Sequence, residues 1–532
     1  MGTRGYYVLR YRNIYFAQYH NYDSYPDGLG VTVLQSMQIP NAITTYRQML
    51  GEILDGLRSL SEIFIVRGDD FSPPSWQRPE NDIFIEWIYE IDLDRNIFHI
   101  NGMPFFSLEC LPDDDAFIQY ISKDHYGNLA CASQCPPEHR YKRPAPPTVS
   151  NSDLATYQSS MWTGSHVALS DLLAINDFLS PDEHIRVLLL EVMIGQCMVE
   201  RTISKDIYNI ELVSDHNQFT DDQWSIACFM ASITFVPQIF DEIKNAFHPM
   251  LERKEFTWVR EDIVVCIATH LDEERCLQAS VSRLINAIME QKDNPGEYFG
   301  VAFSVYHCAV VKVIKDAHTM KFSHTSALQF LPSFYAHSPS TPGITALARL
   351  GFRIDPALFE RVVDICHYVR YKTEKSLARG VDGGNDEPPN ITRSPLPLEL
   401  WKEIALYLDF SDLIPFGLVS KLFREAASMI LRYPHICGYR LVADPKGRTV
   451  DEPFSLSAAA FSAVRAGILA TVVVGLQFED KSPRKLVTPL DVGGESLRVL
   501  FSATSYFPLK SSLEKDNKIP YCHLMSSIRE HT

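Results

Sequence analysis

Residues 394–428 read SPLPLELWKEIALYLDFSDLIPFGLVSKLFREAAS, and the interpretation of the whole chain depends on this stretch. Leu400, Ile404 and Leu408 recur at four-residue spacing, which places them on one face of a helix. Pro397 suits the first turn of that helix, where its missing N–H has no partner to lose. The pattern therefore predicts a first short amphipathic helix.

Two further helices are expected in the same stretch. Ser411 and Ser420 are both of a type that caps helix N-termini. Pro415 and Gly417, which lie between these two serines, both disfavour helix. We therefore expect the second helix to be distorted or to begin at Pro415. Three helices this short cannot bury a core that folds firmly alone. The rest of the chain or a partner protein must therefore cover some of their large side chains.

The stretch resembles an F-box, whose pattern runs L-P-x-E-L, then D-L, then V-S-K and an aromatic residue. The resemblance implies that the module docks on a Skp-type adaptor of a cullin–RING (SCF-type) ubiquitin ligase, while the rest of the chain recruits the substrate. It also implies that the adaptor-binding face, or the small core beneath it, consists of Leu396, Pro397, Leu400, Ile404, Leu408, Leu413, Val419 and Phe423.

Segments rich in proline and glycine divide the remainder. We expect an α+β N-terminal domain, a Pro-rich linker, a helical domain that packs with the first or stands alone, a flexible linker, the F-box and a C-terminal extension. Their predicted ranges are 1–135, 136–150, 151–378, 379–395, 396–432 and 433–532.

The predicted fold class is α+β, mostly α. In the β-rich N-terminal region we expect hairpins over 6–19 and 83–106, and helical spacing follows over 31–60. The middle region is expected to be largely helical, over 167–178, 184–204, 221–247, 261–291 and 355–371. The short C-terminal tail reads as mixed α/β, and its apolar run over 466–476 is too short to span a membrane and reads as a buried strand.

Composition narrows the functional classes. The 532 residues carry a net charge of −17, which argues against nucleic acid as a partner. The 11 scattered cysteines, with no secretory signal pattern, favour reduced thiols and a cytoplasmic or nuclear location. We expect no membrane association.

Enzyme and metal motifs are weak. No phosphate-binding, hydrolase or zinc-protease motif occurs, so we expect no catalytic residues, no cofactor and no metal. Asp92 and Asp94 could hold a divalent cation but suit a hairpin turn better. A zinc site, an N-terminal nucleophile at Thr3 and a triad at a polar turn are weaker alternatives. The zinc ligands would be His125, Cys131, Cys135 and His139, and the triad would be His20, Asp23 and Ser24.

Residues 1 to about 370 also resemble uncharacterised fungal proteins in segments such as YHNYDSYPDGLG at 19–30, a resemblance that implies no activity. The leading hypothesis is thus a substrate-recruiting F-box subunit that is not itself an enzyme. Two alternatives remain: an N-terminal enzyme of unknown class whose F-box controls its turnover, or an interaction scaffold independent of any ligase. The length of the segment before the motif suggests that the recruiting surface lies within residues 1–371.

Overall fold

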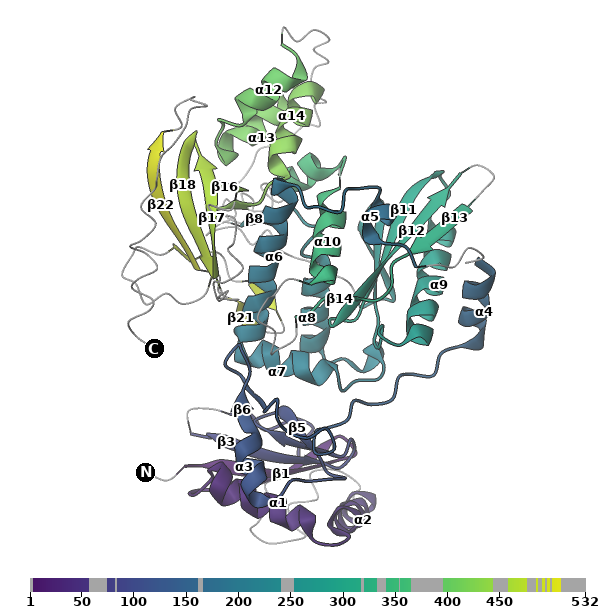
Figure 1. The fold of residues 1–532 in the computed structure, drawn as a ribbon, viewed down its shortest axis with the longest axis vertical. Helices are drawn as coiled ribbons and strands as arrows, with labels where there is room; N and C mark the ends of the chain where they lie inside the picture. The colour runs from purple at the N-terminus through teal and green to yellow at the C-terminus, as the bar shows by residue number, and fades with distance from the viewer. Residues whose placement is uncertain are drawn as a thin grey trace, which may run out of the picture.

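The computed structural model (Figure 1) describes most of the chain. The described residues are 3–56, 74–81, 84–160, 166–240, 253–316, 320–332, 341–353, 355–364, 396–443, 458–475, 485–486, 490–492, 495–497 and 500–508. The predicted flexible linker at 379–395 lies outside these ranges.

A five-stranded sheet forms the N-terminal part, in the order β2-β1-β3-β4-β5. The two predicted hairpins are confirmed, because β1 pairs antiparallel with β2 and β3 pairs antiparallel with β4. β1 and β3 run parallel, so the two hairpins share one sheet. The elements are β1 (Gly5–Tyr11), β2 (Ile14–His20), η1 (Pro26–Gly30), α1 (Val31–Gln38), α2 (Ala42–Asp55), β3 (Trp87–Asp92), β4 (Ile97–Ile100), β5 (Met103–Ser107), α3 (Asp114–Tyr120), β6 (Ile121–Lys123) and β7 (Leu129–Cys131).

The middle region contains helices that are shorter than the periodicity predicts. The stretch predicted as one helix over 184–204 is two helices, because the chain turns at Glu200, whose side chain caps the second. Helix α6 begins with a capping box between Ser180 and Glu183. The elements are α4 (Asn151–Ser160), α5 (Leu169–Leu173), α6 (Pro181–Val199), α7 (Arg201–Ile210), η3 (His216–Gln218), α8 (Asp221–Ser232), α9 (Glu274–Gln291) and α10 (Pro342–Phe352).

The middle region also holds a six-stranded sheet that the sequence analysis did not predict. The helix expected over 261–291 is wrong in its first part, which is a strand that leads into α9. Its residues, IVVCI, are apolar without interruption, and such a short run does not distinguish strand from helix. The strands are β9 (Phe256–Arg260), β10 (Ile263–Ile267), β11 (Gly296–Phe303), β12 (His307–Lys315), β13 (Met320–His324) and β14 (Leu328–Gln329).

A third sheet joins the C-terminal residues to the middle region. β8 (Ile239–Phe240) pairs in parallel with β15 (His435–Ile436), and the seven-stranded order is β19-β22-β18-β17-β16-β15-β8. The strand expected at 466–476 is confirmed as β18. The further strands are β16 (Tyr439–Ala443), β17 (Ala458–Arg465), β18 (Ile468–Gly475), β19 (Lys485–Leu486), β20 (Leu490–Val492), β21 (Glu495–Leu497) and β22 (Leu500–Pro508).

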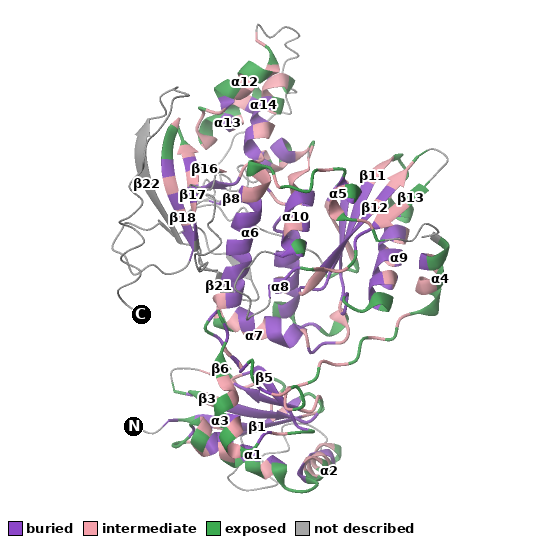
Figure 2. Ribbon diagram, in the orientation of Figure 1, coloured by how far each residue is buried: buried purple, intermediate pink, exposed green. Residues whose placement is uncertain are grey.

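Helix α6 lies at the centre of the molecule, between this sheet and α10 (Figure 1). From Ile185 to Met198 every residue of α6 is buried, which Figure 2 shows as a continuous purple helix. One apolar core includes α6, side chains of the N-terminal sheet and side chains of β17 and β18. The fold is therefore α+β, as predicted. Within the described residues, no helix is both long enough and apolar enough to cross a membrane.

Candidate functional site

Residues 396–432 form three short helices that project from one end of the molecule (Figure 1). They are α12 (Leu398–Ala405), α13 (Phe410–Leu418) and α14 (Lys421–Leu431). Ser420 caps α14 as predicted, because its Oγ accepts the N–H of Phe423 at 3.3 Å. The predicted cap at Ser411 is wrong: α13 begins one residue earlier, at Phe410, and continues through Pro415.

Packing within the module explains why α13 tolerates a proline. The rings of Trp401, Phe416 and Phe423 pack together, with centroids 4.3 Å apart for Trp401–Phe423 and 4.8 Å apart for Phe416–Phe423. One ring comes from each helix, so tertiary contacts hold α13 helical despite the hydrogen bond that Pro415 removes. Predicting a late helix start from local propensity alone was therefore wrong.

One side of the module packs on a helical turn of the same chain, residues 358–364. Leu358, Phe359 and Val362 share a buried cluster with Leu413 and with residues of α14. Phe359 lies directly against Gly417, where a Cβ would come within 2.1 Å of its ring. Gly417, which disfavours helix in isolation, is thus the position at which the chain's own aromatic ring fits.

Polar contacts fix the module on both sides. Arg424 forms an ion pair with Glu360 at 2.8 Å, and Arg432 donates to the carbonyl of Phe352 at 2.6 Å. Downstream, Arg440 of β16 donates to the carbonyl of Leu406 at 3.2 Å. Because these partners precede and follow the module in sequence, its orientation relative to the body is set by direct contacts.

The other side of α12 and α13 is open to solvent (Figure 2). The exposed fractions are 47 % for Leu400, 39 % for Ile404 and 41 % for Val419. Such a concentration of exposed large apolar side chains is typical of a protein–protein interface. We call this set the open face; it comprises Pro397, Leu400, Ile404, Leu418 and Val419, while Tyr407, also exposed, lies against Gly467 in the turn between β17 and β18.

The eight residues predicted for the site fall into three groups. Pro397, Leu400, Ile404 and Val419 are exposed on the open face, and Leu413 is buried at 1 % exposure beneath it. Leu396, Leu408 and Phe423 are partly buried between the two. Sequence reasoning missed Leu418, which is exposed at 46 % and directly precedes Val419.

Comparison with known protein families identifies the domain to which the three helices belong. Residues 394–435 match the family model of the F-box domain. No curated protein and no solved structure matches the chain significantly. The protein therefore carries an F-box domain, and this domain indicates a role as an adaptor in an SCF-type ubiquitin ligase.

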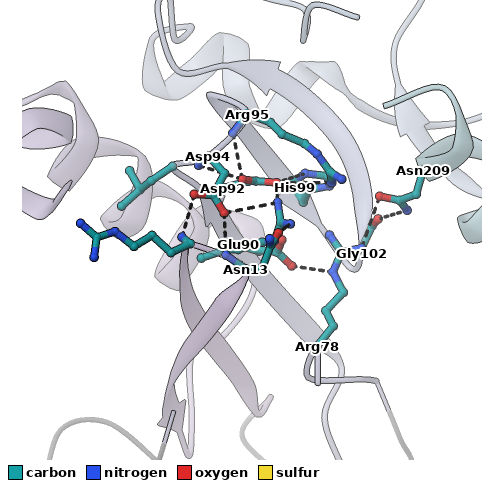
Figure 3. Close-up of polar contacts among 12 residues, drawn as sticks. Asn13, Arg78, Glu90, Asp92, Asp94, Arg95, His99, Gly102 and Asn209 are labelled. Atoms are coloured by element: carbon teal, nitrogen blue, oxygen red, sulfur yellow. Dashed lines mark hydrogen bonds and ion pairs between the residues drawn. The ribbon is translucent and has the colours of Figure 1, made fainter. Parts of the chain in front are cut away.

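Of the two aspartates considered as cation ligands, Asp92 belongs to a buried polar cluster at β3 and β4, whereas Asp94 beside it is exposed (Figure 3). Asp92 Oδ1 accepts the N–H groups of Asp94 and Arg95, each at 3.0 Å, which is the turn geometry expected from the sequence. Asp94 in turn accepts the N–H of Arg12 at 2.7 Å. Both aspartates thus hold the turns of neighbouring hairpins.

Glu90, Asp92 and His99 lie close enough to share a cation, but arginines already hold both carboxylates. Arg10 donates to Asp92 at 2.5 Å. Arg78 donates to Glu90 at 2.6 Å (Figure 3). Burial, together with Arg78, Arg95 and Arg10, lowers the pKa of His99 well below its usual value. Three guanidinium groups face Glu90, Asp92 and Asp94, so these carboxylates are already balanced by cations, which disfavours a metal ion.

The other sequence candidates are brought together only in part: the Ser24 N–H donates to the Thr3 carbonyl at 3.3 Å, and His20 pairs with Gly5 across β1 and β2. Among the described residues, the Glu90–Asp92–His99 group alone has metal-ligating geometry, so the four proposed zinc ligands do not gather. Burial and Cys135 raise the pKa of Cys131 to about 12, which keeps the thiol protonated. Thr3 lies just before the start of β1, whereas Asp92 pairs with Arg10 near the other end of β1. Thr3 and the two aspartates therefore do not share a pocket.

Proposed function

We propose that this protein is the substrate-recruiting F-box subunit of an SCF-type ubiquitin ligase and that it binds a Skp-type adaptor through the open face. The observation that carries the proposal is the asymmetry of the module. Its inner side is covered by Phe359 and its neighbours, while Leu400, Ile404 and Val419 remain exposed on the outer side. Each large apolar side chain buried by a partner contributes roughly 1.5–3 kcal/mol.

A pull-down of the full chain by the purified adaptor tests this proposal. Leu400→Asp with Ile404→Asp places two charges in the interface, and we expect adaptor binding to be lost. The matched control is Ile39→Asp with Met289→Asp, at apolar positions outside the module that are exposed at 62 % and 37 %. Binding that survives the first double substitution refutes the proposal.

Substrate recruitment is assigned to residues 1–371. The support is a group of exposed tyrosines on and after β2: Tyr19, Tyr22 and Tyr25, exposed at 46 %, 74 % and 49 %. Aromatic side chains of this kind are enriched at binding hot spots. Replacing all three with serine in the full chain is expected to keep adaptor binding and reduce ubiquitination of the substrates. Unchanged substrate ubiquitination counts against this surface.

Catalysis is assigned to the other ligase subunits. This assignment is supported by the separation of Thr3 from Asp92 and by the arginines that occupy the Glu90 and Asp92 carboxylates. A hydrolytic activity of the purified chain that Thr3→Ala abolishes would favour the alternative, an N-terminal enzyme whose F-box controls its turnover.

A further inference from the structure

A small cavity of about 20 Å³, partly open to solvent, lies where the end of the F-box module meets the body. Its lining comes from α6, the segment after α8, β9, residues 351–361 and the end of α14. Five arginines line it: Arg186, Arg260, Arg353, Arg361 and Arg432. Asp355 contributes the one carboxylate in this lining, so arginines outnumber carboxylates among the lining residues.

Three of these arginines have carboxylate partners. The pairs are Arg260–Asp262 at 3.1 Å, Arg353–Glu297 at 2.5 Å and Arg361–Asp355. These three charges are neutralised locally, so they do not by themselves call for a ligand.

Arg186 and Arg432 form no ion pair within the described part of the chain, although the nearby Asp182 offsets part of the lowering of the Arg432 pKa by burial. Arg186 donates to the carbonyls of Thr234 at 2.5 Å and Arg432 at 3.4 Å. Arg432 donates to the carbonyl of Phe352 at 2.6 Å. Neutral carbonyls offset only part of the cost of taking two cations out of water.

The most buried polar groups of the cavity lack partners. Arg186 is 6 % exposed and its Nε has no hydrogen bond. Gln238 is 2 % exposed, and neither its amide nitrogen nor its amide oxygen is bonded. Burial, reinforced by Arg260, Arg432 and Arg361, lowers the pKa of Arg186 to about 9. Buried polar groups in folded proteins are nearly always satisfied, so the free N–H donors of Arg186 and Gln238 indicate a missing acceptor.

We propose that this cavity binds a phosphate group, carried either by inorganic phosphate or by a small phosphorylated metabolite. The Arg186 and Arg432 guanidinium groups match phosphate oxygens with paired N–H donors. The amide N–H₂ of Gln238 supplies a further donor. The bound anion neutralises the two arginines that have no carboxylate partner.

A ligand at this position joins the F-box module to the body. Arg186 belongs to α6, the central helix, and Arg432 directly follows α14. The phosphate group therefore stabilises the docked orientation of the module. This inference rests on the cavity alone and does not depend on adaptor binding.

Thermal unfolding of the full chain in inorganic phosphate, compared with sodium chloride at equal ionic strength, tests the proposal. Phosphate is expected to raise Tm progressively with concentration, because ligand that binds only the folded state stabilises it by mass action. Inositol hexakisphosphate, as a polyphosphorylated probe, distinguishes the two sources: a shift at far lower concentration than inorganic phosphate favours a phosphorylated metabolite. If neither phosphate nor the polyphosphate shifts Tm beyond chloride, the proposal is overturned.

Two substitutions locate the effect. Arg186→Met and Arg432→Met each remove an uncompensated cation, so both are expected to fold and to lose the phosphate-dependent shift. Arg253→Met is the control, because Arg253 is half exposed and pairs with Asp221 away from the cavity. Both cavity variants retaining the full shift would overturn the assignment. Should both fail to fold, the concentration dependence on the unaltered chain decides: a Tm that rises with the logarithm of phosphate concentration indicates binding, whereas a rise linear in concentration is the general effect of this salt and overturns the proposal.

Discussion

Two serines of the F-box module look alike in sequence but differ in structure. Ser420 is buried and accepts a backbone N–H at the start of α14, whereas Ser411 is exposed and lies inside α13. We expect Ser420→Ala to lower the free energy of unfolding by about 1 kcal/mol, the usual cost of a lost cap. Ser411→Ala should leave it nearly unchanged. Chemical denaturation of the two variants checks this, and equal effects would contradict the assigned helix start.

Gly417 is the contact point between the module and the body. A glycine-to-alanine change inside a helix normally stabilises it by up to about 1 kcal/mol. Here the added methyl would meet the Phe359 ring, so Gly417→Ala is expected to destabilise by about 1–3 kcal/mol. In a Phe359→Ala background the same change should become neutral or stabilising. Denaturation of the four variants gives this double-mutant cycle, and a stabilising Gly417→Ala in the unaltered chain would contradict it.

At the scale of elements, β15 couples the module to the middle region through His435. Burial, with Arg440 nearby, lowers the pKa of His435 from 6.5 to about 4, and its Nδ1 lies 2.8 Å from the Tyr433 carbonyl. Because the folded state favours the neutral ring, this stabilisation is complete above pH 6.5 and is lost as pH falls towards 4. The loss is about 3 kcal/mol.

His435→Gln is therefore expected to flatten the acid limb of the stability curve between pH 7 and 4. His125→Gln is the control, because His125 is exposed. The measurement is the denaturation midpoint across this pH range. An acid limb of unchanged steepness in His435→Gln would show that other groups dominate it.

Elements with a clear periodic or turn signal were predictable from sequence. The hairpins around Asn13 and Asp92 and the strand over 468–475 follow from alternation and turn residues. The strand at 263–267 was not predictable from sequence, because an uninterrupted apolar run fits a helix as well as a strand. The start of α13 was missed because packing of Phe416 against its neighbours outweighs local propensity.

The open face and the arginine-lined cavity also differ in how far they could be predicted from sequence. The open face occupies one short stretch, so helical spacing identifies Leu400 and Ile404. The arginine-lined cavity joins residues 186, 260, 361 and 432, which only the tertiary fold brings together. No local pattern distinguishes these arginines from surface arginines.

At the scale of the whole molecule, the C-terminal strands and α6 share one core. Val472 of β18 is fully buried in the same cluster as the α6 side chains. Val472→Asp is expected to destabilise the chain by at least about 3 kcal/mol, because it buries a charge without a partner. Ile468→Asp, on the same strand but 41 % exposed, should be tolerated. Soluble yield and Tm measure both, and a tolerated Val472→Asp would contradict a shared core.

This shared core has a consequence for recruitment. The F-box module is held by Phe359 before it and by β15 and β16 after it, so the body and the module keep a fixed relation. A surface on residues 1–371 would then present a substrate at a defined position relative to the adaptor. Tests of recruitment therefore need the full chain, because removing residues 1–371 also removes β8 and Phe359.

The central claim is that the open face binds a Skp-type adaptor. Affinity purification of the tagged full chain from cells, with the partners identified by mass spectrometry, tests it most directly. We predict that the adaptor and a cullin co-purify with the chain and that both are lost with Leu400→Asp and Ile404→Asp. Purification without the adaptor, or with equal adaptor for both proteins, would contradict the account.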